Sequence, residues 1–218
     1  PQSITARSGV GRLTTVARQI DIHYPVDWTT LGEYLAKLEA RGVSQNVASF
    51  VGATSVRVYV LGEDDRDPTP AELVLMQDLV RQAMREGAFG VGSGLFYAPQ
   101  SFSSIEEVIA VISAAKPYGG VYDTHQRDES SNSIGLLNSV REAIRVGRES
   151  GLTTNLGHVK ALGVDVWGFA DSVLRLMRES RAQGHMVVAD QYPWTASGTG
   201  LSAALLPRWA QAGGGESL

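Results

Sequence analysis

The sequence predicts an α/β protein built on a parallel sheet, and three observations support this fold class. Apolar segments of strand length alternate with segments of helical spacing through most of the chain. The strand segments are continuously apolar and flanked by helices, which is typical of a parallel sheet covered on its faces. They begin near residues 46, 88, 120, 152 and 186, the regular spacing of a (β/α) barrel or a doubly wound sheet. Five strands are too few to close an eight-stranded barrel, so either the sheet is open or the barrel is incomplete.

The elements follow one another in a regular order. The first helix is predicted over 27–42, where apolar residues recur at helical spacing. The second is predicted over 68–87, with Thr69 as N-cap and Glu72 at the capping-box position. The other predicted elements are strands 46–52, 88–95, 120–125, 152–158 and 186–190, and helices 103–120, 136–151 and 170–184.

The composition excludes several classes of protein. The 218 residues include 19 Lys and Arg against 23 Asp and Glu, a net charge of −4 that offers no basic surface for nucleic acid. There is no cysteine, which excludes disulfides and thiolate ligands within the chain. No apolar run is long enough to span a membrane, and the start of the chain lacks signal-peptide order. No glycine-rich phosphate-binding motif follows a strand. We therefore expect a cytoplasmic protein without nucleic-acid or membrane partners.

Titratable side chains occur where the predicted strands end. One strand ends in His125, the next in His158 and the last in Asp190, with Tyr192 just beyond. Reactive groups collect at the carboxyl ends of strands in parallel α/β sheets. If the first two of these strands are neighbours, the two imidazoles are close enough to share one metal cation. The alternative, which the pattern leaves open, is a pair of hydrogen-bonded structural histidines.

Residues near these histidines also have two interpretations each. If the extended backbone continues, Lys160 would point the same way as the histidine two residues before it, which suits a cation for a substrate carboxylate beside a metal. Otherwise it is a surface lysine. Residues 127–129 form either a solvated loop with one ion pair or a network that orients His125. Carboxylate-pair catalysis as in glycosidases is also open. His23 and His185 are interpreted as structural or exposed.

Longer segments allow a more specific interpretation. They are NVASFVG, REGAFGVGSGLFYAP, GGVYDTHQRDE, LGHVKALG and ADQYPWTASGTGLSAALLPRW, within residues 28–209. In order and spacing they resemble segments of the N-acyl-D-amino-acid deacylases (D-aminoacylases), in the metal-dependent amidohydrolase superfamily. The family fold is a (β/α)8 TIM-type barrel with a small β domain. The resemblance implies that residues 1–218 are the central part of one such barrel, about strands 3 to 7, without the β domain and the first, second and eighth strands.

The resemblance also implies an activity. His125 and His158 look like the metal-binding histidines of the fifth and sixth strands, and Lys160 and Tyr192 look like residues that hold the substrate carboxylate. The implied reaction is zinc-dependent hydrolysis of the amide of a small N-acyl-D-amino acid, which gives a D-amino acid and a carboxylic acid.

The chain departs from the family pattern in two respects. One is Gly198, where the family often has a hydroxyl residue, and the other concerns the metal-binding and catalytic motifs. The family also has a His-x-His pair, a cysteine ligand and a catalytic aspartate on the eighth strand, and this chain lacks these motifs. Asp190 belongs to the seventh-strand motif and does not replace that aspartate. We therefore expect the catalytic aspartate outside this chain and the isolated piece to be inactive. The alternatives are another cyclic-amide or dipeptide amidohydrolase (dihydroorotase-like), or a catalytically incomplete barrel fragment.

Overall fold

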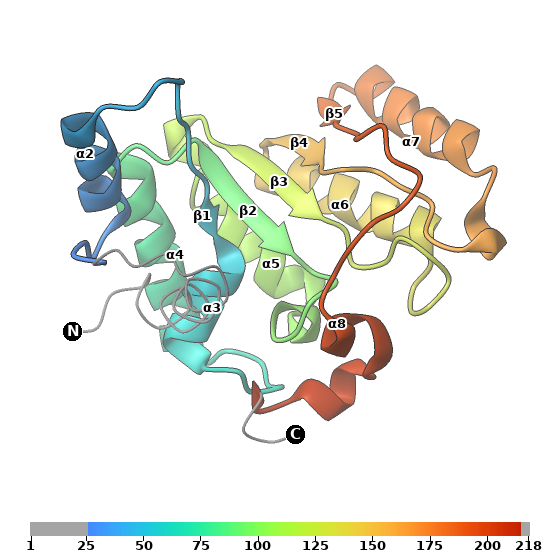
Figure 1. Ribbon diagram of the computed structural model, residues 1–218, viewed down its shortest axis with the longest axis horizontal. Coiled ribbons are helices and arrows are strands. Elements are labelled where there is room, and N and C mark those ends of the chain that lie inside the picture. The colour runs from blue at the N-terminus through green and yellow to red at the C-terminus, as the bar shows by residue number, and fades with distance from the viewer. Residues whose placement is uncertain (1–25, 215–218) are drawn as a thin grey trace.

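The computed structural model describes residues 26–214, and these contain a parallel sheet of five strands (Figure 1). The spatial order is β1-β2-β3-β4-β5, the same as the order along the chain. The strands are β1 (Val51–Gly52), β2 (Gly90–Gly94), β3 (Val121–His125), β4 (Thr153–Leu156) and β5 (Val187–Ala189). All five predicted strands and their parallel pairing are confirmed. His23 lies outside the described residues.

The helices form a row that follows the order of the strands. Consecutive helices from α3 to α7 contact one another, and Figure 1 shows α5 and α6 behind the sheet. The α-helices are α2 (Leu31–Arg41), α3 (Ala53–Leu61), α4 (Pro70–Arg85), α5 (Ile105–Ser113), α6 (Leu136–Ser150), α7 (Ala170–Ala182) and α8 (Leu201–Leu205). A doubly wound sheet reverses its strand order at a switch point, and this sheet does not. The architecture is therefore that of a partial (β/α) barrel.

Helix α4 begins where its capping signals predict. The Thr69 hydroxyl accepts a hydrogen bond from the backbone of Glu72, and the Glu72 carboxylate accepts one from the backbone of Thr69. This reciprocal box satisfies backbone donors that would otherwise lack partners. Within the helix, Met76, Val80 and Met84 are buried at helical spacing against the core.

Helix α3 is absent from the sequence prediction, and the first strand is shorter than predicted. The segment ATSVRVYVL is rich in β-branched residues, which favour strands. It is nevertheless helical, because a helix buries Ala53, Val56, Arg57 and Leu61 on one side. Packing overrides local propensity here. The preceding strand ends at Gly52, as predicted, but it begins at Val51 rather than at residue 46 and so consists of only two residues.

The core consists of two apolar clusters between the sheet and the helices. The first lies under β1 to β3 and includes Val56, Val80, Val91, Ile112 and Tyr122. The second lies under β4 and β5 and includes Val140, Leu156, Val173, Met177 and Val187. Close packing of α6 on β4 requires glycine at position 147, because a Cβ atom there would overlap the Thr154 hydroxyl. Within residues 26–214, no helix has the length and apolar character needed to cross a membrane.

A buried ion pair joins α3 to α5. Nη1 of Arg57, a fully buried residue, donates to both carboxylate oxygens of Glu107 at 2.7 and 2.6 Å. Nη2 donates to the backbone carbonyls of Asp64 and Arg66, and the Ser103 hydroxyl donates to Glu107. The pair thereby connects the loop after α3 to the start of α5.

We predict that Arg57→Ala lowers the free energy of unfolding by about 3–5 kcal/mol, because it leaves the Glu107 carboxylate buried without its cation. Urea denaturation followed by circular dichroism measures the change. The matched control is Arg81→Ala, which removes a solvent-exposed pair with Asp78 and should cost at most about 1 kcal/mol. Equal, small effects of the two substitutions would contradict the prediction.

Candidate metal and substrate site

The pairing of β3 with β4 brings the two predicted histidines together. His125 is the last residue of β3, and His158 lies two residues beyond the end of β4. The strands are parallel neighbours, with Thr124 opposite Leu156. The imidazole ring centroids are 4.6 Å apart and the rings are perpendicular. The structure therefore has the side-by-side arrangement expected from the spacing of these strands.

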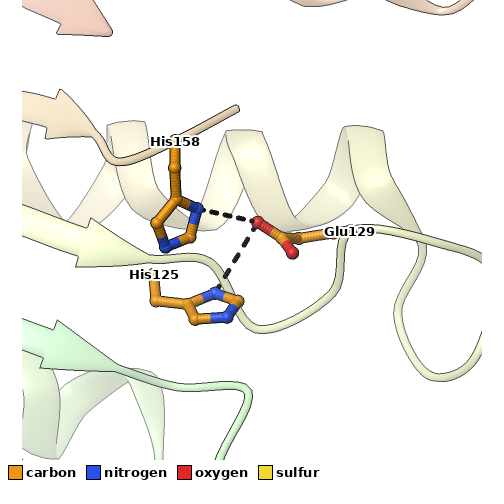
Figure 2. A group of neighbouring side chains, drawn as sticks. All are labelled: His125, Glu129 and His158. Carbon is orange, nitrogen blue, oxygen red and sulfur yellow. Dashed lines mark ion pairs between the residues drawn. The ribbon is translucent and has the colours of Figure 1, made fainter. Parts of the chain in front are cut away.

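Glu129 joins the two histidines from the loop after β3. It is only 3% exposed, and its Oε1 lies 3.7 Å from Nδ1 of His125 and 3.4 Å from Nδ1 of His158 (Figure 2). One possible ligand atom from each of the three residues lies within 4.8 Å of the others. Two imidazoles and a carboxylate are a donor set that divalent transition metals accept. This group of residues could therefore hold a metal ion.

The electrostatic state of His125 suits a metal ligand. Burial, together with the positive field of His158 and Lys160, lowers the pKa of His125 to about 4. The imidazole is therefore neutral at pH 7, which is the form that binds metals. Its Nδ1 is buried and has no hydrogen-bond partner among the described residues. Burial raises the pKa of Glu129, although Lys160 and His158 act in the opposite direction.

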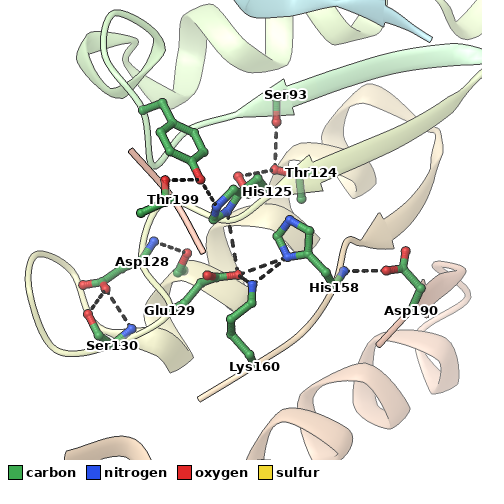
Figure 3. A network of polar contacts seen from close by, with 12 residues as sticks. Ser93, Thr124, His125, Asp128, Glu129, Ser130, His158, Lys160, Asp190 and Thr199 are labelled. Carbon is green, nitrogen blue, oxygen red and sulfur yellow. Dashed lines mark hydrogen bonds and ion pairs between the residues drawn. The ribbon is translucent and has the colours of Figure 1, made fainter. Parts of the chain in front are cut away.

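Two aromatic residues after β2 hold the His125 ring. Phe96 stacks on the imidazole with the ring centroids 5.4 Å apart and the planes 6° from parallel. The Tyr97 hydroxyl lies 3.2 Å from Nε2 of His125 and 3.3 Å from the Thr199 hydroxyl (Figure 3). Thr199 belongs to the segment after β5, which runs past the carboxyl ends of the strands to α8 (Figure 1). The ring is thus held at one nitrogen and on one face.

Lys160 and Tyr192, the two other predicted site residues, lie beside the histidines. Nζ of Lys160 donates to Oε1 of Glu129 at 2.5 Å and lies 2.7 Å from Nδ1 of His158. The same nitrogen is 5.6 Å from the centroid of the Tyr192 ring. Lys160 is thus not a free surface lysine, and the structure places all four predicted residues in one group.

The interpretation of residues 127–129 as a solvated loop is wrong. Arg127 forms an ion pair at 2.7 Å with Glu142 of α6. Asp128 and Glu129 are 1% and 3% exposed. The Asp128 carboxylate accepts hydrogen bonds from backbone N–H groups of its own loop, those of Ser130, Ser133 and Gly135. Arg127 therefore anchors the loop, Asp128 shapes it, and Glu129 supplies a carboxylate to the site. The sequence does not separate these roles, because loop residues have no periodicity that shows where each side chain points.

A cavity of about 340 Å³ opens above these groups. Its lining includes His125, Glu129, His158 and Lys160. The other lining residues are Phe96, Tyr97, Leu162, Tyr192, Trp194 and residues 196–199. The site therefore combines a few titratable groups with a largely apolar lining, as is usual for small-molecule sites. His185, by contrast, lies within 3.0 Å of the Thr154 hydroxyl and does not line the cavity, which agrees with its structural interpretation.

Comparison with known proteins identifies relatives of the chain. No family model matches it. A D-aminoacylase from Alcaligenes xylosoxydans xylosoxydans is 34% identical over 169 residues, which cover 78% of this chain and 34% of the relative. The chain is a homologue of the D-aminoacylases. The chain spans about a third of the length of this curated relative.

Solved structures agree with this relationship. The crystal structure of a D-aminoacylase that defines a novel subset of amidohydrolases matches with a TM-score of 0.73 at 30% identity, over 80% of this chain and 38% of that one. The N-acyl-D-glutamate deacylase from Bordetella bronchiseptica, in complex with zinc and a phosphonate mimic of the tetrahedral intermediate, matches with a TM-score of 0.74 at 28% identity. That match covers 79% of this chain and 36% of the deacylase. The amidohydrolase-like partial barrel is thereby confirmed.

We predict that Asp128→Asn lowers the free energy of unfolding by about 1–3 kcal/mol at pH 7, because buried donors of the loop lose a charged acceptor. Burial raises the pKa of Asp128, but hydrogen bonds from Ser130, Ser133 and Gly135 outweigh burial and hold the pKa at about 2. The folded-state pKa is thus below the unfolded value, so the stabilisation is present above about pH 4 and is lost as the pH falls toward 2. Denaturation of both proteins across this pH range measures the difference.

The matched control is Asp165→Asn, which alters a carboxylate that accepts an exposed hydrogen bond from the Ser131 hydroxyl. This substitution should change stability little at any pH. The difference in the free energy of unfolding between Asp128→Asn and the unsubstituted chain should shrink below pH 4. If it does not, the stabilisation does not come from the charged form of Asp128.

Proposed function

We propose that the protein carrying this chain is a zinc-dependent hydrolase of N-acyl-D-amino acids, which releases a D-amino acid and a carboxylic acid. The observation that carries the proposal is the convergence of His125, Glu129 and His158 at neighbouring strand ends, in a chain homologous to the D-aminoacylases. The zinc complex of the related N-acyl-D-glutamate deacylase supports the choice of metal.

We assign His125 and His158 as zinc ligands. The neutral, buried Nδ1 of His125 has no hydrogen-bond partner among the described residues, so a metal ion would satisfy it. Glu129 lies within reach of the same ion and also holds Lys160. Zinc, when bound, acidifies a water molecule and polarises the amide carbonyl. Two histidines and one carboxylate resemble the three-ligand sets of catalytic zinc sites.

We assign Lys160 and Tyr192 to the substrate carboxylate. Nζ of Lys160 lies next to His158, so a carboxylate bound there would be held beside the metal ligands. A charge-assisted hydrogen bond from an ammonium group to a carboxylate is stronger than a neutral one. Because the ammonium already pairs with Glu129, it is held in place before a substrate arrives. Such preorganisation orients the amide relative to the metal.

We also propose that residues 1–218 are the central part of one barrel domain. The sequential order of the strands and the match to about a third of a D-aminoacylase support this. The catalytic aspartate implied by the family resemblance then comes from outside the chain. The His-x-His and cysteine ligands implied by the same resemblance would also lie outside it. With this incomplete ligand set, we expect residues 1–218 alone to hold zinc weakly and, without the aspartate, to show no deacylase turnover.

The proposal predicts that His158→Ala reduces bound zinc and lowers the rate of N-acyl-D-amino-acid hydrolysis by at least about 100-fold. Mutation of a residue that only hydrogen-bonds to a metal ligand already lowers metal affinity or activity about 10–100-fold, and loss of the ligand itself should cost more. Metal analysis and kinetics of the protein that carries this chain test it. His185→Ala, which alters a histidine outside the cavity, should retain both zinc and activity. Unchanged zinc and turnover in His158→Ala would reject the assignment, and faster hydrolysis of N-acyl-L-amino acids or cyclic amides would reject the substrate class.

The assignment of Lys160 predicts that Lys160→Gln raises KM for N-acyl-D-amino acids about 10- to 100-fold, since a hydrogen bond to a charged group contributes about 1.5–3 kcal/mol. The same substitution should leave KM for an N-acyl amine without a carboxylate nearly unchanged. The control is Lys116→Gln. Lys116 is an exposed lysine in the turn Lys116–Tyr118 before β3. Equal losses with both substrates would show that Lys160 does not recognise the carboxylate.

A further inference from the structure

His158 has an unusual backbone conformation. Its φ angle is +37°, and among residues 26–214 it is the one residue other than glycine with a positive φ. A side chain on Cβ makes the left-handed region unfavourable, because Cβ comes too close to backbone oxygen. Such a conformation persists only where surrounding contacts impose it, and it occurs most often at functional sites. Some contact must therefore hold His158 in this state.

The Asp190 side chain supplies that contact. Asp190 follows β5, the neighbour of β4, and its Oδ1 accepts a hydrogen bond from the backbone N–H of His158 at 2.5 Å (Figure 3). Backbone bonds lie on either side, from Asp190 N–H to the Leu156 carbonyl at 3.2 Å and from Val159 N–H to the Asp190 carbonyl at 2.9 Å. The bond to His158 differs from these, because a carboxylate rather than a backbone carbonyl accepts it. A charged acceptor makes it the stronger kind of bond.

The Asp190 carboxylate is itself held in place. Its Oδ2 accepts a hydrogen bond from Nδ2 of Asn155 at 2.7 Å. The same nitrogen donates to Oδ1 of Asp123 at 2.6 Å. A chain of side chains thus crosses from β3 through β4 to the residue after β5, and it ends on the backbone of His158. The carboxylate can therefore not rotate away without breaking a second bond.

We infer that Asp190 is a positioning residue, which holds the His158 backbone in its left-handed conformation and thereby turns the imidazole toward His125. With the backbone bent at this point, the two ring centroids lie 4.6 Å apart. Asn155 fixes the direction of the Asp190 carboxylate. The inference rests on the proposed function only in its consequence for zinc, because the position of the ring is a property of the protein without metal.

The metal-free test is nuclear magnetic resonance of Asp190→Ala, with Asp78→Ala on α4 as a control that removes an exposed carboxylate. We expect Asp190→Ala to lose both the Cα and Cβ shifts of a left-handed His158 and the nuclear Overhauser contacts between the two imidazoles. Asp78→Ala should keep both. Retention of the shifts and contacts in Asp190→Ala would overturn the inference. If Asp190→Ala fails to fold, Asp190→Asn is used in its place. Its neutral acceptor makes a weaker hydrogen bond, so the resonance of the His158 amide proton should move upfield. A resonance that does not move would overturn the inference.

The zinc test uses titration against a chromophoric chelator. Asp190→Ala should bind zinc about 10- to 100-fold more weakly than the unsubstituted protein, the effect of removing an outer contact of a metal ligand. Asp190→Asn should lose less, because its carbonyl oxygen still accepts the His158 N–H. Undiminished affinity in Asp190→Ala, while His158→Ala binds weakly, would overturn the inference and leave the proposed function intact. If the unsubstituted protein and His158→Ala bind zinc with equal affinity, the assignment of His158 as a zinc ligand is rejected. The nuclear magnetic resonance test alone then decides whether Asp190 positions His158.

Discussion

The parallel pairing of β3 with β4 is the constraint on which the site depends. Parallel strands end at the same edge of a sheet, so the register that places Thr124 opposite Leu156 also places the residues after them side by side. The core packs helices behind these strands, and Gly147 allows α6 to lie directly against β4. Since the helices lie behind the sheet, the groups at the strand ends remain available to a ligand. Stability and chemistry are thus assigned to different parts of the same strands.

Burial at this edge gives the site its electrostatic character. It lowers the pKa of His125 and raises that of Glu129, so removal of water favours the neutral form of both groups. Lys160 opposes this effect at Glu129 by direct ion pairing. A divalent cation would act in the same direction as Lys160, because it favours a charged carboxylate and a neutral imidazole. In the metal-free protein His125 is therefore already in the neutral form that a metal requires, whereas Glu129 depends on a cation, here Lys160, to favour its charged form.

Sequence patterns predict the parts of this structure that depend on periodicity and local capping. The five parallel strands, the capping box at Thr69 and the two histidines at strand ends are of this kind. Helix α3 is not, because its β-branched residues become helical only through packing on one side. Glu129 reaches the histidines because Asp128 shapes the loop through bonds to residues further along. No local signal in the sequence carries that kind of information.

The hydroxyl of Tyr97 lies between His125 and Thr199, and it has only one proton to donate. When the lone pair of Nδ1 is free, Nε2 of His125 carries the ring proton and donates to Tyr97. Tyr97 is then free to donate its own proton to Thr199. In the other tautomer Nε2 accepts from Tyr97, so the one proton of the phenol is used and the Thr199 hydroxyl must donate to Tyr97. The segment after β5 is therefore chemically connected to the protonation state of His125.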